Sequence, residues 1–231
     1  MPTPAPTDAL VRRTLDAWFA DPADDRLDLP RPKRWFGGGA ALDASLRAGF
    51  GDAIDAAARG AHDAALGSPD GALALVVLLD QFPRNVHRGT ARAFAYGDHA
   101  LAMAGLALAR GHDESLSPVA RVFLALPFEH DESAASQARA IASLEAVARA
   151  ADAARAAVAD GGAGAGADGG QALARADAVA TFASGALDSA REHAAIVERF
   201  GRYPHRNAAL GRDSTPAERR WLADGPRRFG Q

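Results

Sequence analysis

Apolar residues recur at three- and four-residue spacing along most of this chain, and that spacing places side chains on one face of an α-helix. Two early segments show it most clearly, with apolar positions at Val11, Leu15, Trp18 and Phe19 and then at Leu42, Leu46, Phe50 and Ile54. β-Branched residues are sparse, and no run alternates apolar and polar residues as a half-buried strand would. The pattern therefore predicts an all-helical protein.

One segment is apolar on all sides. It is ALALVVLLDQF, which follows Asp70 and is expected to end at Pro83, because proline lacks the N–H that a continuing helix needs. A helix that is hydrophobic all round is expected to be buried. We therefore predict that this segment is the central helix of the fold.

Cap and turn signals delimit the later helices. Their expected ranges are about 91–110, ended by Gly111; 118–127, capped by Ser117 and ended by Pro127; about 133–158; about 171–200; and a last helix that begins at the capping box of Thr215 and Glu218. The stretch GGAGAGADGG is typical of a flexible linker, which we place near residues 159–170. The segments predict an all-α array of about eight helices, packed as antiparallel pairs in one domain over residues 1–231.

Charge and composition narrow the classes of function. The net charge is −3 with 24% charged residues, so the chain has no general basic field of the kind that nucleic acids or membrane surfaces attract. The absence of cysteine excludes disulfides, thiolate metal sites and a cysteine nucleophile. No apolar signal-peptide core and no bilayer-length apolar run is present, so we expect a cytoplasmic protein with no nucleic-acid or membrane partner.

Two distant stretches carry nearly the same polar pattern. LDQFPRNVHRGTARAF and ERFGRYPHRNAALGR each follow an apolar run with an aromatic residue, a proline, and closely spaced Arg and Asn. No acidic residue occurs over 81–97 or over 199–212, although the protein is net acidic. Because Lys33 is the only lysine, arginine is common here and only its context is informative. The candidate anion ligands in these two stretches are Arg84, Asn85, Arg88, Arg202, His205, Arg206, Asn207 and Arg212.

Both stretches are predicted to be helix-to-helix turns, so structural explanations stay open beside an anion pocket. The carbonyl end of a helix favours cations, which would account for one or two arginines in each turn but not for four. Compositional bias toward arginine is a further explanation. Within the first stretch, Arg84 lies four residues after Asp80, and we expect these two to pair if the helix continues.

The string LPFEHDE supplies a third group of polar residues. We expect Glu129 to pair with an arginine of a basic turn, and His130 to donate to an anion or to shuttle a proton. The spacing of these side chains does not suit a metal ion, and the glycine-rich stretch lacks the Lys-Ser/Thr of a phosphate-binding loop, so we predict neither a metal nor a cofactor. His193 shares a helical face with Val197 and Phe200, which indicates a packed residue rather than a ligand.

Several of these strings occur together in a known family. With Trp35-Phe36, LALVVLLDQFPRN, RGTARAFA, LPFEH and RFGRYPHRNAALGRDSTPAE in this order, the chain resembles the bacterial family of unknown function DUF924 from about residue 10 to the end. The resemblance implies an all-helical fold similar to tetratricopeptide-repeat arrays, and it implies no established activity. The chain departs from the family pattern at Ala64 and Ala65, where a tryptophan is expected, at Ala125, where an aromatic is common, and in its glycine-rich insertion.

Two classes of function remain open. In the first, the two Arg-Asn turns and the Glu129–His130 turn converge on one side of the array and bind an anionic small molecule or a peptide carboxylate through planar arginine forks. In the second, the same residues form a buried network inside a structural or protein-interaction scaffold. No nucleophile is identifiable, so the sequence does not decide whether the protein is an enzyme. An exposed apolar end of the array would suit a homodimer.

Overall fold

The computed structural model describes residues 6–19, 29–37, 39–160 and 167–225, and these ranges contain helices and no strand. The elements in chain order are α1 Pro6–Phe19, α2 Pro32–Phe36, α3 Ala40–Ala58, η1 Asp63–Gly67, α4 Pro69–Val76, η2 Val77–Gln81, α5 Phe82–Val86, η3 Ala91–Phe94, α6 Gly97–Ala109, η4 His112–Ser115, α7 Pro118–His130, α8 Ala134–Asp160, α9 Ala167–Phe200, η5 Pro204–Arg206 and α10 Pro216–Ala223.

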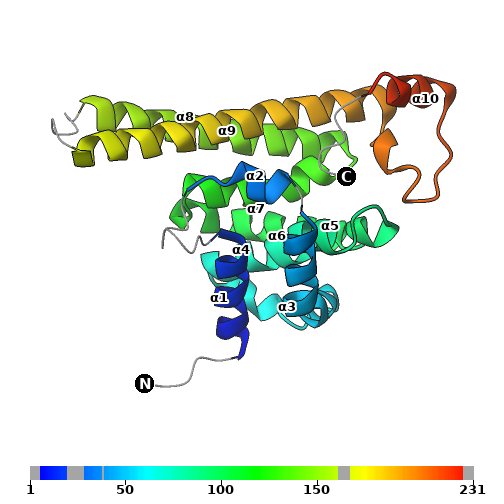
Figure 1. Cartoon of the computed structure of the whole chain (residues 1–231), viewed down its shortest axis with the longest axis horizontal. Coiled ribbons are helices and arrows are strands. Elements are labelled where there is room, and N and C mark those ends of the chain that lie inside the picture. Colours follow the sequence, from blue (N-terminus) through cyan, green and yellow to red (C-terminus); the bar gives the residue numbers. More distant parts are fainter. Residues whose placement is uncertain (1–5, 20–28, 38, 161–166, 226–231) are drawn as a thin grey trace.

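Helix α7 lies between two groups of helices. Figure 1 shows α8 and α9 side by side along one side of α7, with the chain running out along α8 and back along α9, and α1, α3, α4, α5 and α6 on the other side. The side chains agree with this picture, because Val122 and Ala125 of α7 belong to a core shared with α8 and α9, whereas Phe123 and Leu124 belong to the larger core with α1, α3 and α4. The middle of α7 is therefore buried on both sides.

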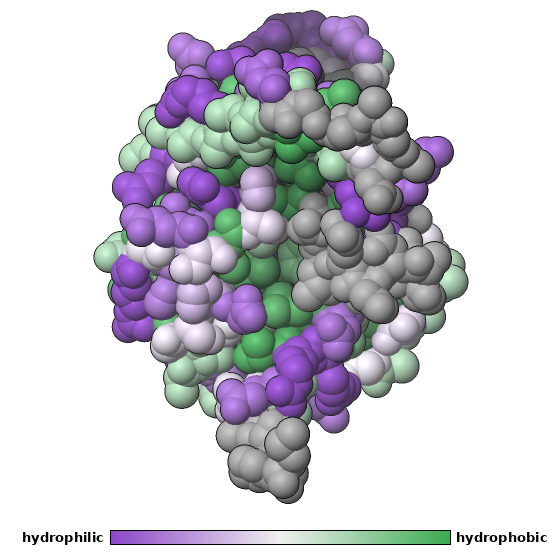
Figure 2. Space-filling model, turned by 90° about the vertical axis from the view of Figure 1, so that its left-hand side faces the viewer, coloured by the Kyte–Doolittle hydropathy of each residue, from purple (hydrophilic) through white to green (hydrophobic). Residues whose placement is uncertain are grey.

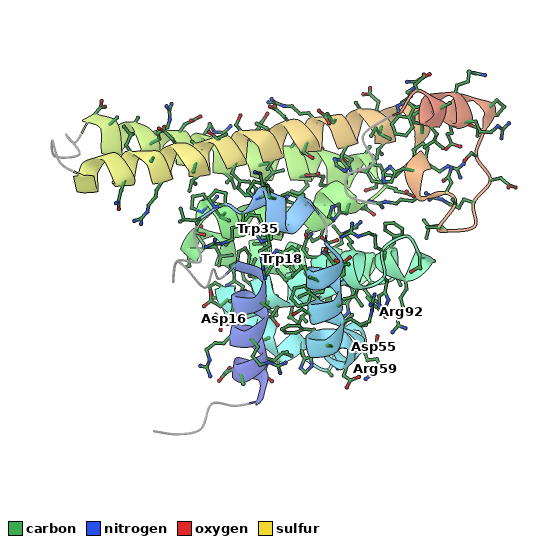
Figure 3. The ribbon with its side chains drawn as sticks, in the orientation of Figure 1. Asp16, Trp18, Trp35, Asp55, Arg59 and Arg92 are labelled. Atoms are coloured by element: carbon green, nitrogen blue, oxygen red, sulfur yellow. The ribbon has the colours of Figure 1, made fainter. Side chains whose placement is uncertain are left out.

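The aromatic residues of the larger core join α2 to this arrangement. The Trp35 indole Nε1 donates to the Trp18 carbonyl at 2.8 Å, and Figure 3 shows the two tryptophans one above the other. The Phe123 ring lies 4.7 Å from the Trp35 ring and 5.2 Å from the Phe19 ring, both edge to face. These contacts fix the short helix α2 beside α7, where it forms one wall of the site described below.

The segment predicted to be the central helix is buried as expected. Each residue from Ala72 to Leu79 is 3% exposed or less. Its N-terminus is capped by Ser68, whose Oγ accepts a hydrogen bond from the Gly71 N–H at 3.1 Å.

The prediction that Pro83 ends this helix is wrong. Helix α4 continues through the π-turn η2 into α5, and Pro83 occupies the first turn of α5. In η2 the Phe82 N–H bonds to the carbonyl of Val77, five residues earlier. This wider turn accommodates a residue that has no N–H and whose ring would clash with a carbonyl in a regular helix. The same turn contains Asp80 and Gln81, two residues of the site described below.

The prediction that Pro127 ends the next helix is also wrong. Ser117 caps α7 as predicted, its Oγ accepting from the Ala120 N–H at 3.3 Å, but α7 continues to His130 with Pro127 inside it. Burial of both faces of α7 outweighs the loss of one helical hydrogen bond. Glu129 and His130 therefore lie in the last turn of a helix and not in a loop.

The predicted linker boundaries also differ from the structure. Ala159 and Asp160 belong to α8, and α9 already begins at Ala167, so both ends of the predicted linker are helical. The remainder of the predicted linker, residues 161–166, lies outside the described residues. The alanine-rich end of α8 favours helix, whereas α9 begins in spite of Gly169 and Gly170, which disfavour it. The capping box at Thr215 and Glu218 is confirmed and starts α10.

Hydrophobic residues form a band on the face of the molecule that lies at the left of Figure 1. Figure 2 shows this band between more polar surfaces. No helix in the described ranges is both long and apolar enough to cross a membrane.

Candidate functional site

A cavity of about 60 Å³ lies where α2, η2, α5, α7, α9 and η5 meet. This volume holds several water molecules or one small oxyanion. Its lining residues are Trp35, Phe36, Gln81, Arg84, Asn85, Arg88, His130, His193, His205 and Arg206. The structure thus brings together residues of both basic stretches and one residue of the LPFEHDE string.

Arg206 is the most unusual residue of this cavity. Its side chain is buried, with 6% of the residue exposed, and its Nη1 donates to the His130 carbonyl at 2.8 Å. The guanidinium carbon lies 4.2 Å from the centre of the Tyr203 ring, and Nε is buried without a hydrogen-bond partner. No carboxylate of the described residues forms an ion pair with it. Burial, with help from Arg84, lowers the pKa of Arg206 to about 9, so it is a cation at neutral pH.

Arg84 is the second cation of the cavity, and it is partly neutralised by Asp80. The predicted pairing is confirmed, since Arg84 Nε lies 3.2 Å from Asp80 Oδ1. The two terminal nitrogens of Arg84 make no hydrogen bond within the described part of the chain. The positive charges of Arg84 and Arg206 therefore exceed the one negative charge of Asp80 at this wall. Arg88, which also lines the cavity, pairs with Asp43 at 3.4 Å.

Asp80 lies beneath the cavity and is 2% exposed. Both of its carboxylate oxygens lie 2.8 Å from Nδ1 of His130, and Gln81 Nε2 donates to Oδ2 at 2.5 Å. Burial alone would raise the pKa of Asp80, but His130 and Arg84 hold this pKa well below its usual range. Asp80 is therefore ionised, and it fixes the orientation of the His130 ring.

Glu129 does not pair with an arginine, contrary to the prediction. It is 3% exposed and faces α9, where its Oε1 lies 3.0 Å from Nδ1 of His193 and accepts from the Ser189 hydroxyl at 3.1 Å. The last turn of α7 explains the difference, because adjacent helical positions point about 100° apart and only His130 faces Asp80.

His193 is buried as predicted, yet it also lines the cavity. His193, Gln81 and the two aromatic residues of α2 line the cavity but were not predicted from the sequence as site residues. His193 carries no sequence signal of its own, because its importance comes from a carboxylate that is far away in the chain. Gln81 directly follows Asp80 in the quoted string, so its proximity was accessible from the sequence.

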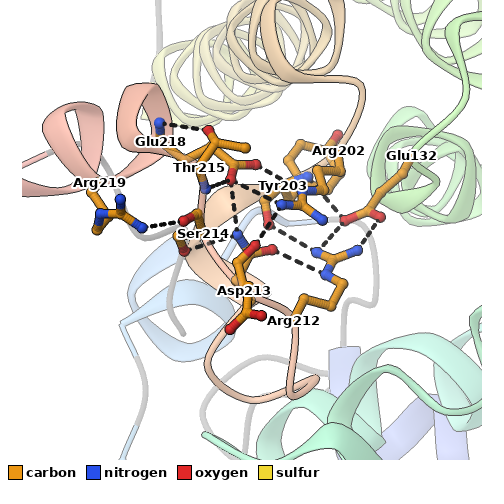
Figure 4. A network of polar contacts seen from close by, with 10 residues as sticks. Glu132, Arg202, Tyr203, Arg212, Asp213, Ser214, Thr215, Glu218 and Arg219 are labelled. Carbon is orange, nitrogen blue, oxygen red and sulfur yellow. Dashed lines mark hydrogen bonds and ion pairs between the residues drawn. The ribbon is translucent and has the colours of Figure 1, made fainter.

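Three predicted ligands lie outside the cavity in a network of polar contacts: Arg202, Asn207 and Arg212. Figure 4 shows this network around Arg202 and Arg212. Arg202 donates two hydrogen bonds to Glu218, at 2.7 and 2.9 Å, and Arg212 donates two to Glu132, at 2.6 and 3.0 Å. Asn207 Nδ2 donates to the Ser214 hydroxyl at 3.0 Å. These contacts hold the segment between α9 and α10 together and against the turn between α7 and α8. Such bidentate pairs are satisfied by protein groups alone.

The cavity histidines predict how stability depends on pH. Burial, with Arg84, lowers the pKa of His130 to about 4 despite Asp80 and Glu129, and burial, with Arg206, lowers the pKa of His205 to about 3. The unfolded chain has pKa values near 6.5, so between about pH 4 and 6.5 it binds more protons than the folded protein. Stability is therefore complete above pH 6.5 and falls as the pH drops toward 4.

We expect the free energy of unfolding to fall by about 2 kcal/mol per histidine between pH 6.5 and 5. Urea unfolding at several pH values measures this, and His130→Asn should flatten the profile over this window. The acidic groups with lowered pKa values act below this window, so they do not mask the effect. A profile that is flat in the unmodified protein would contradict the burial of these neutral rings.

The fold and the site define an all-helical protein with a cation-lined cavity at the meeting point of six elements. The sequence profile described as "Bacterial protein of unknown function (DUF924)" matches residues 14–226, and the chain belongs to this family. A solved structure of a protein of unknown function, ATU0120 from Agrobacterium tumefaciens, is similar, with 36% sequence identity, a TM-score of 0.72, and coverage of 95% of this chain and 99% of that one. The comparison with curated proteins finds no match.

Within the described ranges, no three or more His, Asp or Glu side chains form a group suited to a metal ion.

Proposed function

We propose that this protein binds a ligand through an anionic group, a carboxylate or a phosphate, which sits in the cavity between Arg84 and Arg206. The observation that carries the proposal is the buried guanidinium of Arg206, which has no carboxylate partner among the described residues. A buried charge without a counter-ion is strongly unfavourable, so a protein that keeps one has a use for it. An anion supplies the missing charge and accepts from the nitrogens that are unpaired.

The two arginines would recognise the anion by their planar forks, which match the oxygens of a carboxylate or phosphate. Asn85, Arg88, His130 and His205 complete the wall. Glu129 does not line the cavity, but it contacts His193, which does. We leave Arg202, Asn207 and Arg212 out of the proposed site, because each has protein partners.

A purely structural role is the second candidate, and the network around Glu132 and Glu218 favours it for that part of the molecule. It explains the arginines that have carboxylate partners, but it gives no reason for Arg206. We also propose that the helices form a single tetratricopeptide-like array of pairs and that the protein is cytoplasmic. The side-by-side course of α8 and α9 supports the helix-pair proposal.

Thermal unfolding with and without ligands tests the proposal. We expect inorganic phosphate, or a short peptide with a free C-terminus, to raise the melting temperature, with stabilisation of about 2.7 kcal/mol at a hundredfold excess over Kd. Arg84→Ala should lose this shift, whereas Arg149→Ala, which removes a mostly exposed arginine of α8, should keep it. The proposal fails if neither type of anion shifts the unmodified protein, or if Arg84→Ala responds equally.

A further inference from the structure

A larger groove adjoins the cavity. It has a volume of about 930 Å³ and runs between α7 and α9, with Pro30, Pro32 and Phe36 along one edge. Phe36, His130 and His193 line the cavity and the groove alike. The cavity and the groove therefore meet at these three side chains.

The groove differs from the cavity in chemistry. Helix α9 contributes Ala174, Ala178, Phe182 and Ala186, which follow one another at four-residue spacing along one helix face. Leu126 of α7 lies among the residues opposite, and Phe36, at the shared border, is 48% exposed. Small and aromatic side chains of this kind suit an apolar guest.

We infer that the ligand is a single-chain amphiphile, with its carboxylate or phosphate head between Arg84 and Arg206 and its apolar chain in the groove. This inference rests on the proposed anion site and adds the class of its ligand. Charge selects the end that enters the cavity, because the cavity has a positive balance whereas the groove contains the acidic residues Glu129 and Asp177.

At the border between the cavity and the groove, His130 lies where the ligand's head group would join its apolar chain. His130 is held through Nδ1 by Asp80, and its Nε2 makes no hydrogen bond within the described part of the protein. Because the Asp80 carboxylate can only accept, Nδ1 of the neutral ring carries the proton and Nε2 is a hydrogen-bond acceptor. A hydroxyl or N–H group of the ligand at this point would therefore find a polar partner between the cavity and the groove. On the groove side, the stretch of α9 from Ala174 to His193 is about 28 Å long at 1.5 Å per residue, which suits an extended alkyl chain.

Calorimetric titration with alkyl phosphates of increasing length, kept below their micelle concentrations, tests this inference. Each added methylene that enters the groove is expected to strengthen binding about threefold to fourfold until the groove is filled. Inorganic phosphate measures the head site alone. Alkanols of the same lengths should bind far more weakly, because they lack the charge.

Two neighbouring substitutions on α9 separate the groove from the cavity. A Cβ at Gly185 would meet no other atom within 4 Å and Gly185 lines the groove, so Gly185→Leu is expected to fold and to fill that space. It should remove the dependence on chain length and leave the affinity for inorganic phosphate unchanged. Ser184→Leu adds a similar side chain at an exposed position outside the groove and should bind as the unmodified protein does.

The outcomes distinguish this inference from the proposal on which it depends. Equal affinity for short and long alkyl phosphates, or chain-length dependence that survives Gly185→Leu, would overturn the amphiphile while leaving the anion site intact. Failure of both inorganic and alkyl phosphates to bind would reject the anion site itself.

Discussion

Arg206→Met is expected to raise the free energy of unfolding of the ligand-free protein by about 1 to 2 kcal/mol and to abolish anion binding. Methionine keeps much of the length and apolar surface of arginine but removes a buried charge that has no carboxylate partner among the described residues. The substitution also removes repulsion from Arg84. The hydrogen bond to the His130 carbonyl and the contact with the Tyr203 ring are lost, and these oppose the gain only in part.

Urea unfolding gives the stability, and calorimetric titration with phosphate gives the binding. Arg212→Met is the matched control, because it removes an arginine of the same segment that is paired with Glu132, and this variant should lose stability. Changes of opposite sign in the free energy of unfolding of the two variants would distinguish an arginine that serves binding from one that serves the fold. An Arg206→Met protein that is less stable and still binds phosphate would reject the site.

Asp80→Asn is expected to lower the free energy of unfolding by about 3 to 5 kcal/mol. The amide has nearly the shape of the carboxylate, but it removes the negative charge that contacts Arg84 and His130 in a buried position. Arg84 and Arg206 would then share the cavity wall without this counter-charge. Phosphate should therefore stabilise Asp80→Asn more than it stabilises the unmodified protein, because the bound anion replaces the missing charge.

Chemical unfolding in the presence and absence of phosphate measures both effects. Asp55→Asn provides the control, since Asp55 pairs with Arg92 at 2.6 Å in a largely exposed position, at the lower right of Figure 3. Exposed pairs contribute little, so this variant should stay close to the unmodified protein with or without phosphate. If Asp80→Asn changes the free energy of unfolding as little as Asp55→Asn does, the cavity wall does not carry the excess positive charge described above.

The sequence predicted the helices well but not how two of them end. The apolar repeat marks the buried central helix, and the Ser117 and Thr215 caps are local signals that the structure confirms. The stop predicted at Pro83 is wrong because a π-turn precedes it, and the one at Pro127 is wrong because α7 is buried on both sides. The wider turn accommodates Pro83, and tertiary packing overrides the local preference of Pro127.

Some contacts of the candidate site could likewise be predicted from the sequence, and others could not. The pairing of Arg84 with Asp80 follows from a spacing of four on one helix, so the sequence predicts it. Arg202, Arg206 and Arg212 look alike in the sequence, and contacts from distant elements decide their roles. Glu218 and Glu132 neutralise the first and the last, whereas Arg206 turns into the cavity.

The most direct test of the anion site is a crystal structure of the protein grown with selenate or tungstate, whose anomalous scattering marks the position of the ion. We expect a peak in the cavity, with the oxygens of the ion within about 3 Å of nitrogens of Arg84 and Arg206. We expect no such peak in Arg206→Met crystals grown in the same way. A cavity that holds only water, or an ion that binds equally without Arg206, would contradict the proposed anion site.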